Sequence, residues 1–135
     1  MIRKVKLITA SQVKSVNEEV CKDGGNEHLC YDLGKIESAL HSAFYPGEPP
    51  FQHGGLAKVA GAIAFYISKA HAFFDGNKRT AVLSSALFLK VNDWVLLYPP
   101  DSLADLIEAC ASGRASVEDV KDWFDAHKIN VSFSS

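Results

Sequence analysis

Apolar residues recur at the spacing of an α-helix along almost the whole chain, and this periodicity limits the fold more than any other feature. Over residues 55–70 they stand at positions i, i+3, i+4 and i+7, as in a helix with one buried face. Over residues 81–91 eight of eleven residues are apolar and occur on every side. This second pattern predicts a central helix, starting at Lys78 or Arg79, that is buried all round.

Four more helices are predicted from capping and turn signals. Two of them start at residues that have the form of capping boxes, Thr9 with Gln12 and Ser116 with Asp119. The other two helices cover about 32–44 and the segment from Asp101 and Ser102, as caps, to a closing Gly113. Residues 94–98 are predicted to be extended, and the tail after Lys128 to be loose. The sequence therefore predicts a single all-α domain over residues 1–135, with about six helices.

Composition excludes several classes of protein. The net charge of −2 argues against direct DNA binding, which needs a basic surface. No apolar run is as long as a membrane span, and the N-terminus lacks the apolar region of a signal peptide. The three cysteines, Cys21, Cys30 and Cys110, show no disulfide or metal-binding spacing, so we expect thiols in a reducing cytoplasm.

Residues 71–80 gather polar groups that suit phosphoryl transfer. His71 can move a proton at neutral pH, and Asp75 is a hard oxygen ligand suited to Mg²⁺. Gly76 permits close backbone approach, and donors at the start of the next helix form an anion site: Asn77, Lys78 and Arg79. Taken singly, each residue is more often a cap, a turn or a surface group, so the prediction depends on their joint occurrence. No Walker A spacing occurs in the chain.

The same segment, His-x-Phe-x-Asp-Gly-Asn-Lys-Arg-Thr, resembles the signature of Doc (death-on-curing) toxins, the compact branch of the Fic superfamily. Weaker similarity at 33–40, 102–106 and 113–120 extends the resemblance over about 9–124. It implies a helical bundle whose motif loop leads into the central helix. It also implies a base, His71, a Mg²⁺ ligand, Asp75, and a buried anchor, Phe73. The ATP phosphates would be held by Gly76, Asn77, Lys78 and Arg79, and the proline-rich loop at 45–53 would dock the target.

Two departures from the Fic pattern bear on the reaction. Lys78 replaces a glycine, and Val82 stands where AMP-transferring Fic enzymes have a last arginine. The first change adds a bulky cation and the second removes a guanidinium, so the nucleotide is expected to sit differently. The resemblance to Doc then implies that the γ-phosphate, rather than the α-phosphate, faces the base. We therefore expect transfer of phosphate.

The resemblance also implies partners. The target would be a hydroxyl residue of a translation factor such as elongation factor Tu, whose modification would inhibit translation. The inhibitor would be a Phd-like antitoxin whose C-terminal segment docks in a groove. Three alternatives stay open: a Fic-type AMP-transferase, a non-catalytic module that binds nucleotide or phosphate, and a plain helical bundle with a structural loop.

Overall fold

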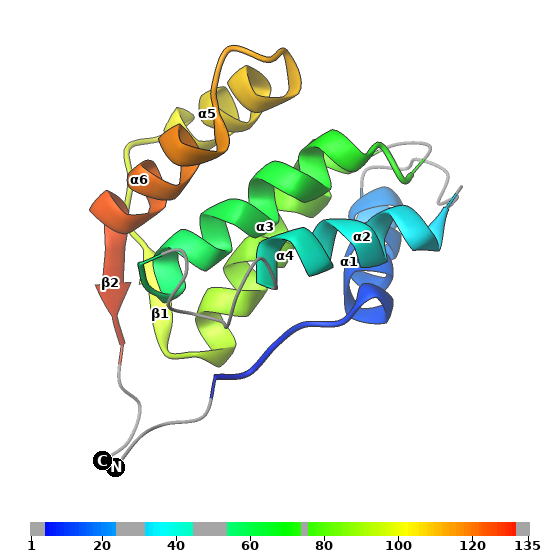
Figure 1. Cartoon of the computed structure of the whole chain (residues 1–135), viewed down its shortest axis with the longest axis horizontal. Coiled ribbons are helices and arrows are strands. Elements are labelled where there is room, and N and C mark those ends of the chain that lie inside the picture. The colour runs from blue at the N-terminus through cyan, green and yellow to red at the C-terminus, as the bar shows by residue number, and fades with distance from the viewer. Residues whose placement is uncertain (1–4, 24–31, 45–53, 74–75, 132–135) are drawn as a thin grey trace.

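A computed structural model describes residues 5–23, 32–44, 54–73 and 76–131. Cys30, the predicted target-docking loop at 45–53 and Asp75 lie outside these ranges. The described chain is a bundle of helices with a two-stranded sheet (Figure 1), which confirms the all-α prediction. Its elements are α1 Ala10–Asp23, α2 Leu33–Phe44, α3 Leu56–Ala70, α4 Asn77–Val91, β1 Trp94–Leu96, α5 Ser102–Ala111, α6 Val117–His127 and β2 Lys128–Asn130. Among these residues no helix is both long and apolar enough to cross a membrane.

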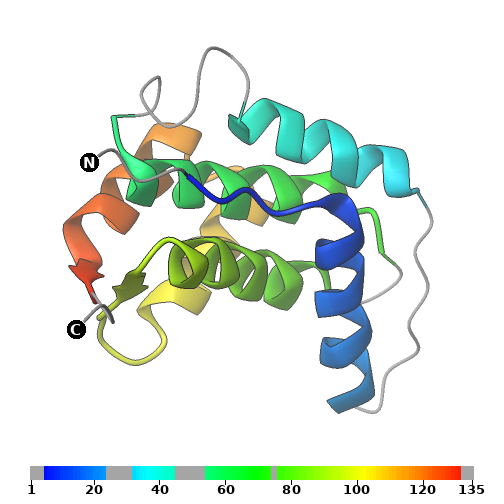
Figure 2. The same cartoon turned by 90° about the horizontal axis from the view of Figure 1, so that it is seen from below.

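Helix α3, rather than α4, is the most enclosed helix of the described chain. It packs against α2, α4, α5 and α6, and α2 and α4 run alongside it in Figure 2. Helix α4 leads out of the motif loop as predicted, but it is buried on one face only, and Leu83 is 42% exposed. The buried face carries small residues, which let neighbouring helices come close. One of them, Ser85, satisfies its hydroxyl by donating a hydrogen bond to the carbonyl oxygen of Val82 at 2.8 Å.

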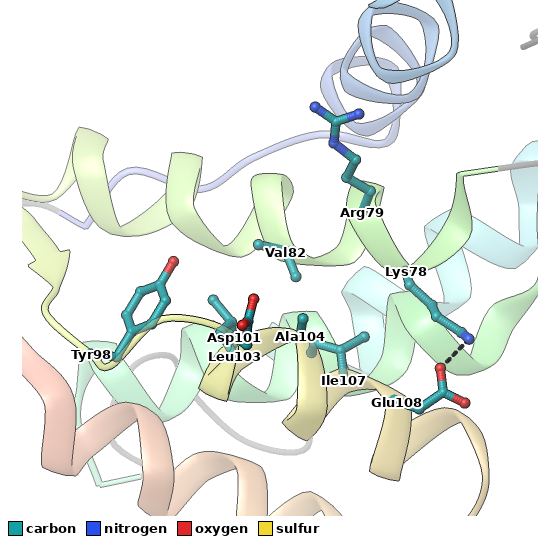
Figure 3. Close-up of a pocket in the computed structure, with 9 residues that line it drawn as sticks. All are labelled: Lys78, Arg79, Val82, Tyr98, Asp101, Leu103, Ala104, Ile107 and Glu108. Atoms are coloured by element: carbon teal, nitrogen blue, oxygen red, sulfur yellow. Dashed lines mark hydrogen bonds and ion pairs between the residues drawn. The ribbon is translucent and has the colours of Figure 1, made fainter. Parts of the chain in front are cut away.

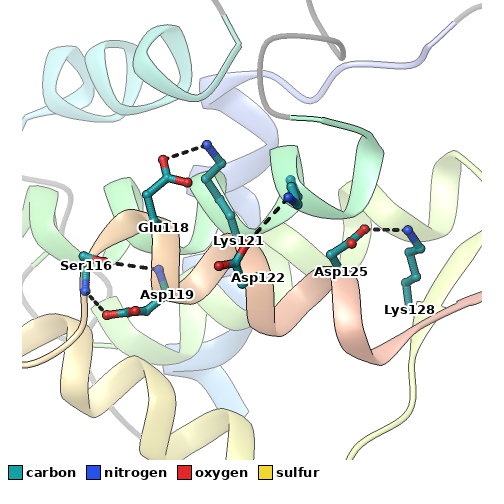
Figure 4. A network of polar contacts seen from close by, with 8 residues as sticks. Ser116, Glu118, Asp119, Lys121, Asp122, Asp125 and Lys128 are labelled. Atoms are coloured by element: carbon teal, nitrogen blue, oxygen red, sulfur yellow. Dashed lines mark hydrogen bonds and ion pairs between the residues drawn. The ribbon is translucent and has the colours of Figure 1, made fainter.

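Helix α6 is fixed against α3 by a close backbone approach. A Cβ atom on Gly61 of α3 would lie 2.9 Å from the Cα of Lys121, so only glycine fits. Lys58 of α3 also pairs with Asp122 at 3.6 Å (Figure 4). The predicted capping box at the start of α6 is confirmed. The Asp119 N–H donates to the Ser116 hydroxyl at 3.2 Å, and the Ser116 N–H donates to the Asp119 carboxylate at 2.9 Å.

The predicted box at the start of α1 is confirmed in the same way. The Thr9 N–H donates to the Gln12 side-chain oxygen at 2.8 Å, and the Gln12 N–H donates to the Thr9 hydroxyl at 3.2 Å. From this start α1 runs across the end of the bundle at which α4 begins (Figure 2). Helix α1 therefore borders the motif loop.

Two predictions near the C-terminus were wrong. The tail is not loose directly after Lys128, because residues 128–130 form β2 and pair antiparallel with β1, Val95 opposite Ile129. The extended segment at 94–96 has unpaired N–H and C=O groups along its edge, and the tail satisfies them. Asp101 does not cap α5 with its side chain. It lies in the left-handed region at φ 66°, and the Ser102 hydroxyl donates to the Pro99 carbonyl instead.

Candidate active site

The motif loop opens into a pocket of about 370 Å³, which we call the motif pocket. The end of α3, the start of α4 and the end of α5 meet there. Its lining residues are Ser68, His71, Gly76, Asn77, Lys78, Arg79 and Ala111. The fold therefore brings together every predicted site residue that it describes. The remaining one, Asp75, lies outside the described residues.

His71 occupies the position that ends α3. Its backbone is left-handed, with φ 48° and ψ 44°, and its side chain is exposed. A residue with a Cβ pays about 1–2 kcal/mol for this conformation, which glycine adopts freely. The chain thus keeps a histidine at a strained position on the rim of the pocket, as is common where a side chain has a function.

Asn77 and Phe73 close the motif loop. The Phe73 N–H donates to the Asn77 side-chain oxygen at 3.1 Å, and the Asn77 amide donates to the Phe73 carbonyl at 2.9 Å. Phe73 is 3% exposed, which confirms the predicted buried anchor. The Asn77 side chain therefore holds the loop together. The group that Asn77 offers at the start of α4 is its backbone N–H.

Helix α1 packs so closely against Gly76 that a side chain would not fit there. Its φ is 73°, and a Cβ there would lie 3.0 Å from Val20 Cγ1 and 3.2 Å from Asn17 Nδ2. The structure thus gives two reasons for glycine here, packing against α1 and a left-handed backbone, while the close approach of a ligand to Gly76 stays a prediction. The side that a Cβ would fill is already occupied by α1.

A buried polar contact under the loop was missed from the sequence. Asn17 of α1 donates to the Thr80 hydroxyl of α4 at 3.0 Å, and both side chains are fully buried. Asn17 falls in the stripe formed by Val13 and Val20, and a polar residue in an apolar stripe is the signal that could have revealed it. The contact fixes α1 to the first turn of α4.

The start of α4 has the properties of an anion site. The first hydrogen bond within the helix is donated by Thr80 to Gly76, at 2.8 Å, so the N–H groups of residues 77–79 have no partner within the helix. Gly76 provides no capping side chain, and the first turn holds no acidic residue. The helix dipole adds positive potential at this end.

The two cations of this turn diverge. Lys78 extends toward α5 and donates to the Glu108 carboxylate, while Arg79 points away from α5 (Figure 3). Both also line a second cavity of about 440 Å³ between α4 and α5, which we call the α4–α5 groove. Its other lining residues are Val82, Tyr98, Asp101, Leu103, Ala104, Ile107 and Glu108. The hydrogen bond from Lys78, followed by its charge, lowers the pKa of the Glu108 carboxyl.

The donor set of the motif pocket fits phosphate groups. It offers helix N–H groups, an ammonium and a guanidinium, together with one imidazole. The described residues contain no group of three His, Cys, Asp or Glu side chains that could hold a metal ion on its own. A Mg²⁺ ion held by one carboxylate and by substrate phosphates needs no such group. The described residues are therefore compatible with Mg²⁺ that binds together with a nucleotide.

Comparison with known proteins identifies the family of the chain. The Fic/DOC family matches residues 7–89, more than half of the chain and the whole of the motif. The chain is also similar to the "Protein kinase doc" of Escherichia phage P1, with 39% identity over 67 residues. That alignment covers 50% of this chain and 52% of the phage protein, so the chain spans about half the length of this curated relative. On the family match, the chain belongs to the Fic/DOC family.

Proposed function

We propose that this protein is an ATP-dependent phosphotransferase that moves the γ-phosphate of ATP to a hydroxyl residue of a target protein. The observation that carries the proposal is the meeting of His71 with the start of α4 in one pocket. Phosphoryl transfer depends on positioning of the nucleophile and on stabilisation of negative charge. A base can orient the attacking hydroxyl, and an anion site can stabilise the charge on the phosphate. The similarity to a protein kinase of a phage supports the same reaction class.

In this mechanism His71 accepts the proton of the target hydroxyl. The hydroxyl oxygen then bonds to the γ-phosphorus, and the bond to the β–γ bridging oxygen breaks, which releases ADP. The N–H groups at the start of α4, with Lys78 and Arg79, stabilise the negative charge on the phosphate oxygens. Mg²⁺ bound through Asp75 and the phosphates would add further charge neutralisation.

Phosphate transfer is preferred over AMP transfer because of two positions on α4. Val82 lines the α4–α5 groove and contributes no cation there. Lys78 lines both the groove and the motif pocket, where a Fic enzyme would have a glycine. An AMP-transferase would need a cation that binds the phosphates beyond the α-phosphate, and Val82 provides no cation.

The proposal includes partners and a setting. We propose a cytoplasmic toxin that inhibits translation by modifying a factor such as elongation factor Tu, and that is itself inhibited by a Phd-like antitoxin. A groove of about 530 Å³ between α1 and α4, lined in part by the exposed Leu83, supports docking of an antitoxin's C-terminal segment. With a net charge of −2, direct DNA binding is not proposed.

The test is label transfer into a bacterial lysate with Mg²⁺ and ATP labelled at either the γ- or the α-phosphate. Label from the γ position alone is expected, and it should fall by about 10²–10⁴-fold in His71→Ala. His127→Ala, which changes a histidine on α6, is the matched control and should keep the activity. Label from the α position would instead identify an AMP-transferase. Nucleotide binding without transfer, tested also with purified elongation factor Tu, would favour a non-catalytic module.

A further inference from the structure

One carboxylate of α5 reaches the start of α4. Glu108 accepts a hydrogen bond from the Lys78 ammonium, and the two side chains are 53% and 54% exposed. Another carboxylate of the same helix, Asp105, is exposed and lines neither the groove nor the motif pocket. Glu108 is thus the acidic side chain of α5 that touches the candidate phosphate-binding residues.

Lys78 stands between two cavities. It lines the motif pocket, where the helix N–H groups lie, and also the α4–α5 groove, where Glu108 lies. Figure 3 shows its side chain turned toward Glu108, while Arg79 of the same turn points elsewhere. A single ammonium cannot give its full charge to a carboxylate in the groove and to a phosphate in the pocket. A polyphosphate that enters the motif pocket therefore competes with Glu108 for Lys78.

We propose that Glu108 is a positioning residue that holds Lys78 in the α4–α5 groove and thereby weakens polyphosphate binding in the motif pocket. The inference rests on the proposed function, because it assumes that the motif pocket takes phosphates. Glu108 touches no phosphate itself and acts through Lys78. Its carboxylate adds a second, smaller effect, since a negative charge beside the pocket repels an anion.

The expected size follows from the exposure of the pair. Ion pairs between exposed side chains are weak, so freeing Lys78 should tighten binding only by about two- to fivefold. Inorganic tripolyphosphate is the probe, titrated by calorimetry into the full chain, because it carries the charge of ATP without the nucleoside. Glu108→Gln should bind it more tightly, and Asp105→Asn, which removes the same charge from the same helix, should bind it as the wild type does.

A double-mutant cycle separates this role from general electrostatics. In a Lys78→Met background the gain from Glu108→Gln should shrink to the smaller part that comes from direct repulsion, because no ammonium is left to release. In the label-transfer assay the KM for ATP should fall by the same factor as the dissociation constant. A merely structural role of Glu108 would instead lower kcat and would not depend on Lys78.

The outcomes separate the two proposals. Binding by the wild type with equal or weaker binding by Glu108→Gln would overturn the role of Glu108 and leave the proposed function standing. A gain that is undiminished without Lys78 would also overturn it. Absence of tripolyphosphate binding in the wild type and in both variants would overturn the anion site itself, and both proposals with it.

Discussion

Helices α4 and α6 begin in opposite ways. Helix α6 has a serine cap whose hydroxyl accepts from the third residue, and its first turn holds Glu118 and Asp119. Helix α4 begins after a left-handed glycine, and its corresponding second and third residues are Lys78 and Arg79. Acidic residues stabilise a helix start and basic ones destabilise it. The start of α6 is thus stabilised by its own residues, whereas that of α4 has neither a capping side chain nor an acidic residue.

This difference indicates that the two helix starts are stabilised by different means. The start of α4 is held by its surroundings, through Asn17 bound to Thr80 and through α1 packed on Gly76. The start of α6 needs no such support, because its own cap satisfies it. Substitutions at the two starts should therefore separate stability from anion binding.

The largest effect is expected when the packing of α4 on α1 is disturbed. Gly76→Ala forces a Cβ into the left-handed region and against Val20, so unfolding free energy should fall by about 2–4 kcal/mol. Gly113→Ala is the matched control. It has a similar φ of 81° but open space around it, so the loss should be about 1–2 kcal/mol. Equal losses in urea unfolding would mean that α1 does not constrain the start of α4.

The next prediction makes the start of α4 resemble that of α6. Arg79→Glu places an acid at the third helical position, as Asp119 is in α6. Loss of a charged contact and added repulsion should weaken tripolyphosphate binding by roughly 10–100-fold. The melting temperature should stay equal or rise slightly, because the acid suits the helix dipole.

Arg114→Glu, an equal charge reversal on an exposed turn outside the motif pocket, is the control for this prediction. Calorimetric affinities within about twofold of each other for the two variants would remove Arg79 from the anion site.

The two helix starts also show what could be predicted from the sequence. Capping boxes are local, so Thr9 with Gln12 and Ser116 with Asp119 were predicted correctly, as were all six helices. The candidate site residues could be proposed from the sequence because they are contiguous in one loop. Contacts between residues far apart in the chain leave weaker signals in the sequence. For this reason the contacts of Asn17 and Glu108 could be identified only from the structure.

The prediction for α4 failed for a related reason. Apolar residues on every side suggested complete burial, but burial depends on which face neighbouring helices cover. The covered face holds Thr80, Ser84 and Ser85, while Leu83 remains exposed. Composition alone could not show that small hydroxyl residues would be preferred at the close contacts.

A smaller effect is expected at the cap of α6. Ser116→Ala removes the hydroxyl that accepts from Asp119, and the loss should be about 1 kcal/mol of unfolding free energy. Tripolyphosphate affinity should not change, since Ser116 lines neither the motif pocket nor the α4–α5 groove. Thr9→Ala, at the similar cap of α1, should behave alike in chemical denaturation. A change in anion affinity in Ser116→Ala would contradict the division of roles between the two helix starts.

The smallest effect concerns the strained residue across the pocket from the start of α4. His71→Gly and His71→Ala both remove the imidazole, so both should lose phosphotransfer. Their stabilities should differ, because glycine relieves the left-handed strain at φ 48° while alanine retains it. The greater freedom of glycine in the unfolded chain offsets part of the gain, which leaves His71→Gly more stable by about 0.5–1 kcal/mol. Equal melting curves for the two variants would show that the backbone at residue 71 relaxes once the histidine is gone.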